Sequence, residues 1–382
     1  MTAYPTEKIY LDHAATTPLD DGVFAKMAPF FKGVFGNASS QHSFGREAAN
    51  ALTSARDAVA RVLGVPAKEI YFTCGGTEAD NLGIKGICLA NGDKGRHIVV
   101  SAIEHPAVLE SARSLEKFGY EITYVNPDGD GAIRPESVDS ALRPDTVLVA
   151  VMSANNETGV IQPISEIYEC VHSHGAYLWC DCVQSAGVLP FSRFPADGWA
   201  VSAHKFNGPK GVGFARIKSG VRFEPQMCGG HQERGLRGGT INTPSIVGCA
   251  EALVLAQRNA SDVNKYVSSL RDRFEGKVLS LIDGVFINGC AERLPSHCDM
   301  SITGCDGQNV VMLLDMKGVA ASTGAACSSG ATTSSHVLTA MGLGAERVSG
   351  GVRFSFGKDN TPEQADVAAQ ILADVVSTIR GR

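Results

Sequence analysis

The chain has 382 residues, more than one hydrophobic core usually supports, so two domains are expected. Hydrophobic residues make up 44% and charged residues 19%, and no run reaches the roughly eighteen uninterrupted apolar residues of a membrane helix. The formal net charge of −6 disfavours a direct, non-specific grip on nucleic acid. A protein without membrane or nucleic-acid contact is therefore expected.

The N-terminus and the cysteines indicate the compartment. The first eight residues lead into a polar segment without an apolar signal region, which predicts a cytoplasmic protein. Eleven cysteines without a paired spacing do not form a disulfide framework. Cys180 and Cys182 flank Asp181 in an expected strand, so both should lie on the face opposite the aspartate. We favour packing over metal binding for this pair, and no metal site is predicted.

Strand and helix patterns alternate over the first two thirds of the chain. Short apolar runs rich in β-branched residues occupy residues 70–73, 97–100, 121–125, 147–152 and 177–181. Between them, residues 45–52 and 108–115 have the three-to-four-residue apolar spacing of amphipathic helices. This alternation predicts βαβ units and an α/β fold with a mostly parallel sheet covered by helices.

The pattern changes from about Ser261. A long helical segment is followed by strand-like runs at 285–287 and 300–302, which predicts a smaller α+β domain. We expect a large domain over 15–260 and a small domain formed by 1–14 and 261–382. Residues 228–242 are rich in glycine and arginine without periodicity, and are read as an ordered loop over a site or interface, or else as a plain surface connection.

A glycine turn offers a place for phosphate. Residues 70–81 read as a strand, a turn at Gly75-Gly76 and the start of a helix at Thr77. Free amides at a helix N-terminus, together with the Thr77 hydroxyl, suit an anion. Ser202 and His204 are further candidate phosphate ligands, although Ser202 could simply end a strand.

A lysine and an upstream carboxylate complete the pattern of a pyridoxal phosphate site. Lys205 closes the run 202–205, and Asp181 ends an earlier strand. The lysine amine can form a Schiff base with the cofactor aldehyde, while the aspartate pairs with the pyridinium nitrogen. His105, at the end of another strand, could stack on the ring and move protons. Asn155 could bind the cofactor or substrate, or cap a turn.

Two residues near the C-terminal end suggest the chemistry performed on the substrate. Cys327 lies in a small, polar segment, about 322–335, which does not suit a buried structural cysteine. An exposed thiol there could attack a substrate sulfur and carry it away. Arg353 offers a guanidinium for a substrate carboxylate, with a surface ion pair as the alternative.

These motifs resemble the cysteine desulfurases of the NifS/IscS type, within the class V aminotransferase family of pyridoxal phosphate enzymes. The resemblance extends from residues 10–18 to Arg353, and its most specific parts are residues 202–205 and the segment around Cys327. It implies the fold type I of these enzymes, with a large domain built on a seven-stranded sheet and a smaller domain that carries the cysteine segment.

The resemblance also implies a role for each site residue. Lys205 would hold the cofactor and Cys327 would form the persulfide. The other cofactor contacts would come from Gly76, Thr77, His105, Asn155, Asp181, Gln184, Ser202, His204 and Thr240. Asn155 and Arg353 would bind the substrate carboxylate of L-cysteine, and Thr240 would come from the partner subunit of a homodimer.

Two departures narrow the subgroup and the pathway. The cysteine segment lacks the Arg-x-Gly-His-His-Cys motif of subgroup II, so the chain is similar to subgroup I. It ends at Arg382 without the extension by which housekeeping Isc-type enzymes dock an iron–sulfur scaffold. The overall pattern resembles the desulfurases of DNA phosphorothioation systems at least as well as a nitrogen-fixation enzyme. The sulfur acceptor, an iron–sulfur scaffold or a thio-modification enzyme, stays open. A selenocysteine lyase or aminotransferase, and a non-enzymatic subunit of a sulfur-transfer complex, are the competing hypotheses.

Overall fold

A seven-stranded sheet forms the centre of the larger part of the molecule. The computed structural model describes residues 8–324 and 334–381. The strands follow the order β2-β8-β7-β6-β5-β3-β4, and β8 alone runs antiparallel to its neighbours. Their bounds are β2 Ile70–Thr73, β3 His97–Ser101, β4 Glu121–Val125, β5 Thr146–Ala150, β6 Tyr177–Asp181, β7 Gly198–Ser202 and β8 Gly213–Ile217. The predicted α/β fold with a mostly parallel sheet is confirmed.

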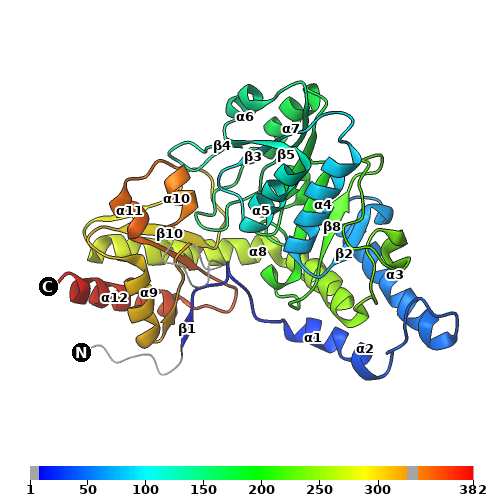
Figure 1. Ribbon diagram of the computed structural model, residues 1–382. Helices are drawn as coiled ribbons and strands as arrows, with labels where there is room; N and C mark the ends of the chain where they lie inside the picture. Colours follow the sequence, from blue (N-terminus) through cyan, green and yellow to red (C-terminus); the bar gives the residue numbers. More distant parts are fainter. Residues whose placement is uncertain (1–7, 325–333, 382) are drawn as a thin grey trace.

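Helices cover both faces of this sheet, which explains why its central strands are continuously apolar (Figure 1). Alternate residues of one strand enter different cores: Val99 packs into the core shared with α3, α7 and the start of α8, whereas Ile98 and Val100 pack against α4 and α5. The helices of this part are α1 Asp21–Met27, α2 Pro29–Lys32, α3 Ser43–Leu63, α4 Gly76–Ala90, α5 Pro106–Ser114, α6 Pro135–Ala141, α7 Ile164–Ser173 and α8 Thr243–Leu281.

A second, smaller sheet has its own hydrophobic core. Strands β9 Val285–Ile287, β10 His297–Ile302 and β12 Gly351–Ser355 form an antiparallel sheet in the order β12-β10-β9. Strands β1 Ile9–Tyr10 and β11 Val319–Ala320 pair in parallel. The helices here are α9 Gly307–Met316, α10 His336–Ala340, α11 Ala345–Ser349 and α12 Pro362–Ile379. Short 3₁₀ helices complete the chain at Ala67–Glu69, Leu115–Phe118, Phe191–Arg193, Ala203–Lys205 and Gln232–Gly235.

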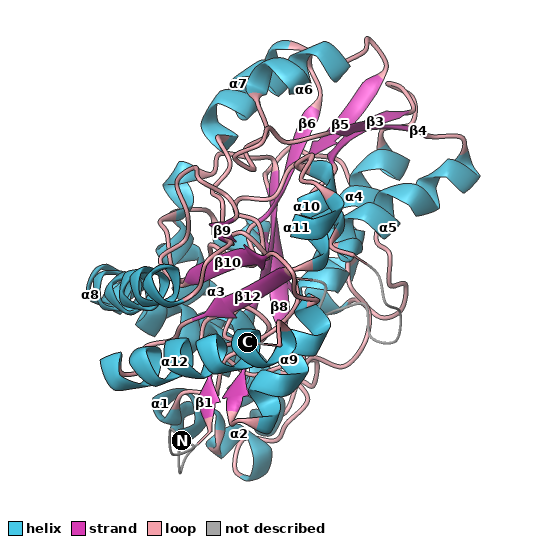
Figure 2. Ribbon diagram, turned by 90° about the vertical axis from the view of Figure 1, so that its left-hand side faces the viewer, coloured by secondary structure: helices cyan, strands magenta, loops and turns pink. Residues whose placement is uncertain are grey.

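Helix α8 joins the two parts of the molecule. Leu253 in its first half belongs to the core of the large sheet, whereas Leu270 and Phe274 belong to the core of the small sheet. Figures 1 and 2 place α12 and the C-terminus at one end of the molecule and α6 and α7 at the other. The sequence pattern starts this helix near 261, and the structure starts it at Thr243. The domain boundary expected at 260 lies inside α8 and stays a prediction.

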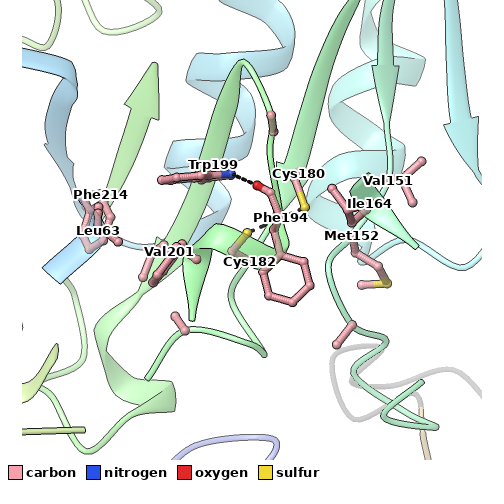
Figure 3. Close-up of a cluster of buried hydrophobic side chains, with 14 of the residues drawn as sticks. Leu63, Val151, Met152, Ile164, Cys180, Cys182, Phe194, Trp199, Val201 and Phe214 are labelled. Atoms are coloured by element: carbon pink, nitrogen blue, oxygen red, sulfur yellow. Dashed lines mark hydrogen bonds between the residues drawn. The ribbon is translucent and has the colours of Figure 1, made fainter. Parts of the chain in front are cut away.

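The cysteine pair around Asp181 is buried among apolar side chains. Cys180 and Cys182 have no exposed surface, and their sulfur atoms lie 3.7 Å apart. Figure 3 shows both sulfurs in the core near Phe194 and Met152. The interpretation as packing residues is therefore confirmed. Among the helices of the described ranges, none is long and apolar enough to span a membrane.

Candidate active site

A cavity of about 560 Å³ opens where several parallel strands end. Open α/β sheets bind ligands at this edge, outside the carboxyl ends of their strands. The wall combines the ends of β6 and β7, the start of α4 and Arg353 from the small sheet. Of the residues predicted for the site, the cavity is lined by Gly76, Thr77, His105, Asp181, Gln184, Ser202, His204, Lys205 and Arg353.

The start of α4 is a place for an anion. No side chain caps this helix, so its first backbone amides keep their hydrogen-bonding capacity toward the cavity. A Cβ atom on Gly76 would lie 2.8 Å from a methyl group of Val183, so only glycine fits there. His204 lies nearby, with its Nδ1 3.1 Å from the Thr16 hydroxyl. Burial, helped by the Lys205 charge, lowers the pKa of His204 to about 4, so its ring is neutral at pH 7.

Lys205 and Asp181 both face the cavity. The Lys205 ammonium donates to the Ala14 carbonyl and, at 3.0 Å, to the Ala15 carbonyl, which fixes the long side chain at the wall. Asp181 accepts a hydrogen bond of 2.8 Å from the Val183 amide and is only 5% exposed. Burial raises the pKa of Asp181 to about 6, and the Lys205 charge opposes this shift. A cationic ring nitrogen beside this carboxylate would favour its ionised form.

His105 is held in a defined orientation. It caps α5, and its Nδ1 accepts a hydrogen bond of 3.1 Å from the Ala107 amide. Burial, and then the positive charge of Lys205, lower the pKa of His105 to about 4. The ring is therefore neutral at pH 7, and with Nδ1 used as an acceptor its proton lies on Nε2.

Arg353 is buried between two acceptors. Its Nη1 donates to the Asn156 carbonyl at 2.7 Å, and its Nη2 to the Asp12 carboxylate at 2.8 Å. Among the described residues, no hydrogen-bond partner meets its buried Nε. A buried donor without a partner lowers the stability of the folded protein by about 1–3 kcal/mol. An anionic ligand in the cavity could accept a hydrogen bond from this group. Gln184 also lines the cavity and donates to the Ala14 carbonyl at 3.1 Å.

Asn155 does not face the cavity, contrary to the prediction. Its side chain has no exposed surface, donates to the Ile103 carbonyl at 2.9 Å, and accepts from the amides of Glu157 and Thr158. The next residue, Asn156, lines the cavity instead, and its Oδ1 is buried without a partner. The turn after β5 uses the first asparagine to hold its own backbone and presents the second to the ligand.

Replacing each asparagine by alanine should separate these two roles. Asn155→Ala leaves buried backbone groups without partners and should lower the free energy of unfolding by about 1–3 kcal/mol. Asn156→Ala removes an Oδ1 that already lacks a partner and should change stability by less than about 0.5 kcal/mol, while turnover falls. Urea unfolding and steady-state kinetics of both variants check this. Equal stability of the two variants would contradict it.

Two predicted site residues are not placed in this cavity. Thr240 is exposed and lines a smaller hollow of about 190 Å³ with Cys74 and Arg237. Cys327 lies outside the described residues. The residues on either side of that gap, Gly324 and Ser334, both line the main cavity.

Four residues near the cavity were not predicted: Asp80, Glu104, Glu157 and His336. Asp80 lies one helical turn after Gly76, so helical periodicity alone could have found it. Its carboxylate accepts from the Trp179 indole at 3.0 Å, and burial raises its pKa well above the usual value. His336 begins α10, and its Nε2 lies 3.0 Å from the Glu104 carbonyl. No motif marks His336, because the fold brings it to the cavity from the other end of the chain.

Glu104 is a buried acid below the cavity. Its Oε1 accepts from the Ser101 hydroxyl and, at 2.7 Å, from the Met152 amide, whereas Oε2 has no partner. Burial raises the pKa of Glu104 to about 8, although both hydrogen bonds oppose the shift. The folded-state pKa exceeds the unfolded value of about 4.5. The contribution of Glu104 to the free energy of unfolding is therefore complete below pH 4.5 and is lost as pH rises to 8.

Glu104→Gln should remove this pH dependence. Between pH 5 and pH 8.5 the wild-type protein should lose stability relative to Glu104→Gln, by at most about 5 kcal/mol. Chemical unfolding at both pH values measures the difference. Glu116→Gln, which removes an exposed carboxylate in the 3₁₀ helix Leu115–Phe118, is the matched control. Its free energy of unfolding should depend on pH as that of the wild-type protein does. A pH-independent difference between wild type and Glu104→Gln would show that Glu104 is ionised throughout.

Comparison with known proteins places the chain in a family. Residues 9–367 match the aminotransferase class-V family. The chain belongs to this family. The IscS 1 protein of Bacillus subtilis (strain 168) is 45% identical over 98% of this chain and its own full length. The cysteine desulfurase IscS of Dictyoglomus turgidum is 41% identical over 98% of this chain and 95% of its own.

Solved structures agree with this assignment. A NifS-like protein superposes with a TM-score of 0.91 at 36% identity, covering 97% of this chain and 100% of its own. DndA from Streptomyces lividans superposes with a TM-score of 0.78 at 34% identity, covering 91% and 99%. The resemblance to NifS/IscS-type enzymes and to their α/β fold is thus confirmed, and with it the expectation that this class-V family member is an enzyme.

Class-V aminotransferases and cysteine desulfurases imply a pyridoxal phosphate cofactor, and the cavity suits it. The uncapped start of α4 fits a phosphate, Lys205 offers an amine, and Asp181 offers a buried carboxylate. Glycine at position 76 lets the start of α4 pack against Val183 beside the cavity. These groups all line the same cavity.

Proposed function

We propose that this protein is a pyridoxal-phosphate-dependent cysteine desulfurase that converts L-cysteine to L-alanine and leaves a persulfide on Cys327. One observation carries the proposal: Gly324 and Ser334, which flank the Cys327 segment, line the same cavity as Lys205, Asp181 and Arg353. A thiol on this segment can therefore reach a substrate held in the cavity. Relatives named cysteine desulfurase support the same reaction.

Each wall residue has a proposed task. Lys205 holds the cofactor, Asp181 pairs with its ring nitrogen, and Gln184 faces its ring hydroxyl. The amides at Gly76 and Thr77, with Ser202 and His204, bind its phosphate. When bound, the cofactor supplies an electron sink for the substrate α-carbon. His105, whose Nε2 carries the exchangeable proton, stacks on the ring and moves protons at the substrate.

The substrate carboxylate binds to Arg353, whose Nε lacks a partner among the described residues, and accepts from the Nδ2 of Asn156, which lines the cavity in place of the predicted Asn155. In the sulfur-transfer step, the Cys327 thiolate forms an S–S bond with the substrate sulfur. The substrate Cβ–S bond breaks, its electron pair remains on the carbon side, and protons from the site complete alanine. The persulfide then passes its outer sulfur to an acceptor.

The proposed reaction is tested by its products. L-Cysteine with an added thiol should give alanine and sulfide in equal amounts, without a keto acid. An aminotransferase would instead give a sulfur-containing keto acid and require an amino acceptor, and a selenocysteine lyase would turn over L-selenocysteine but not L-cysteine. A non-enzymatic subunit would form no alanine. Any of these three results would overturn the proposal.

We further propose that the acceptor is a protein of iron–sulfur assembly or of nucleic-acid thio-modification such as DNA phosphorothioation. The relatives named IscS support the first, and the likeness to DndA is compatible with the second. A cytoplasmic location is proposed with it, because all ten cysteines of the described residues are free thiols, as a reducing compartment requires.

A homodimer in which Thr240 completes the partner's phosphate site is part of the proposal. Sedimentation should give about twice the 40.2 kDa chain mass. Thr240→Ala should weaken cofactor binding about 10- to 100-fold, the effect of one lost hydrogen bond to a charged group. Thr53→Ala, an exposed threonine on α3, is the control.

A mixed dimer separates a shared site from a site within one chain. If Thr240 acts across the interface, a dimer of one Lys205→Ala chain and one Thr240→Ala chain contains one intact site. It should then show about half the wild-type activity per dimer, although neither parent variant is active at the same cofactor concentration. If Thr240 acts within its own chain, the mixed dimer contains no intact site, and activity no higher than that of the parents would exclude the shared site.

A further inference from the structure

Three side chains of different chemistry meet between α6 and α7, at the end of the large sheet that lies away from α12 (Figures 1 and 2). Asp139 belongs to α6, Cys170 to α7, and His174 caps the C-terminal end of α7. Cys170 and His174 are four residues apart, so they share one face of the helix. The cluster is open to solvent, because Asp139 and His174 are exposed and Cys170 is half-buried.

The spacing of the three atoms suits a metal ion. The Cys170 Sγ lies 3.4 Å from the Asp139 Oδ1, and the His174 Nε2 lies 3.7 Å from the same oxygen. All three atoms lie within 4.8 Å of one another. Around a tetrahedral zinc ion with ordinary ligand distances, sulfur, nitrogen and oxygen ligands lie about 3.3–3.6 Å apart. Two of the three spacings are therefore close to those of a bound site without any backbone movement.

The imidazole of His174 is already oriented as a ligand. Its Nδ1 lies 3.1 Å from the Cys170 carbonyl and 3.1 Å from the Ser173 hydroxyl, so the tautomer with its proton on Nδ1 donates to that carbonyl and presents the Nε2 lone pair to Asp139. Metal-binding histidines use the same arrangement, in which the second nitrogen donates to a backbone carbonyl. A lone pair facing a carboxylate is unfavourable unless a proton or a cation lies between them.

The thiol completes a donor set that is typical of zinc. The Cys170 thiol donates to the Asp139 carboxylate over the 3.4 Å that separates Sγ from Oδ1. Zinc displaces such a proton on binding and takes thiolate, imidazole and carboxylate together. Magnesium and calcium prefer sites made of oxygen alone, so this mixed set selects against them.

We propose that Asp139, Cys170 and His174 bind one Zn²⁺ ion, with water as the fourth ligand on the solvent side. The ion ties α6 to α7 at the edge of the large sheet. The three residues lie outside the cavity that contains Lys205, and the proposal does not rest on the desulfurase function. Elsewhere in residues 8–324 and 334–381 there is no other group of three such side chains with metal-ligand spacing.

Cobalt(II) is the probe, because thiolate coordination gives it a charge-transfer band in the near ultraviolet. The holoenzyme carrying Cys327→Ser is titrated with Co²⁺, so that the thiol of the active-site segment cannot supply the sulfur ligand. One equivalent should produce the band, and Zn²⁺ should displace it. Adding Cys170→Ser should abolish the band. His174→Gln should weaken Co²⁺ binding at least about 10- to 100-fold, because a metal site loses that much affinity when only an outer-shell partner is removed.

Cys290→Ser, an exposed cysteine elsewhere on the surface, is the matched control and should leave the band unchanged. Far-ultraviolet circular dichroism verifies that each variant is folded, and zinc should raise the melting temperature of the Cys327→Ser protein but not of the form that also carries Cys170→Ser. The proposal is overturned if no band forms at saturating Co²⁺, or if Cys170→Ser leaves the band intact.

Discussion

Lys205→Ala should give a colourless protein that forms no alanine from L-cysteine. Lys205 is the one lysine that lines the main cavity among the residues the structure describes, and two backbone carbonyls hold its amine at the cavity wall. Without this amine the cofactor loses its covalent attachment, and the substrate loses a positioned acid–base group. The second loss alone costs about 100- to 10,000-fold in rate.

The absorption spectrum of purified protein tests the attachment, and borohydride reduction followed by peptide mass mapping locates it. The wild-type protein should carry the reduced cofactor on the peptide that contains Lys205. Lys26→Ala, an exposed lysine on α1, is the control and should remain yellow and active. A yellow Lys205→Ala protein with borohydride-fixed cofactor on another lysine would show that the assignment of Lys205 is wrong.

Local patterns predict the parts of the site that lie at strand ends. Asp181 ends β6, and Lys205 closes the 3₁₀ helix that follows β7. Because parallel strands end at one edge of a sheet, strand prediction alone brings such residues together. The same reasoning correctly buries Cys180 and Cys182, since side-chain alternation sends them to the face opposite Asp181.

Contacts between distant segments explain what the sequence does not predict. Asn155 and Asn156 are chemically identical, and the choice between them depends on the turn after β5, whose backbone also accepts from Arg353 of the other sheet. Strand β8 is missed because Arg216 interrupts its apolar run. The fold buries that arginine against Glu69 at 2.8 Å, which no local pattern reveals.

The effect of charged residues on other elements also cannot be predicted from the sequence around a site residue. The neutral state of His105 at pH 7 follows from burial together with the charge of Lys205, which comes from another element. A histidine in a loop would titrate near 6.5 by default. The sequence therefore identifies His105 as a candidate base, but only the assembled site shows that it is neutral and which nitrogen carries the proton.

Cys327→Ser should abolish sulfide release and alanine formation while the protein still binds its cofactor and L-cysteine. The groups proposed for binding, among them Lys205, Asp181 and Arg353, lie on described elements and do not include Cys327. Breaking the carbon–sulfur bond needs a nucleophile that accepts the sulfur. A thiol with a pKa near 8.5 supplies some thiolate at neutral pH, whereas a serine hydroxyl with its far higher pKa supplies none.

Spectral titration with L-cysteine measures binding, and alanine and sulfide assays measure turnover on the same samples. Cys290→Ser is the matched control, because it removes an exposed thiol elsewhere and should keep full activity. With L-cysteine labelled with sulfur-35, the wild-type protein should retain labelled persulfide after gel filtration, and the Cys327→Ser protein should retain none. Since Cys327 is the proposed sulfur acceptor, no other cysteine is expected to replace it. Undiminished alanine formation by Cys327→Ser without added thiol would contradict the nucleophile assignment, because the sulfur would then leave without passing through this residue, as in a general lyase.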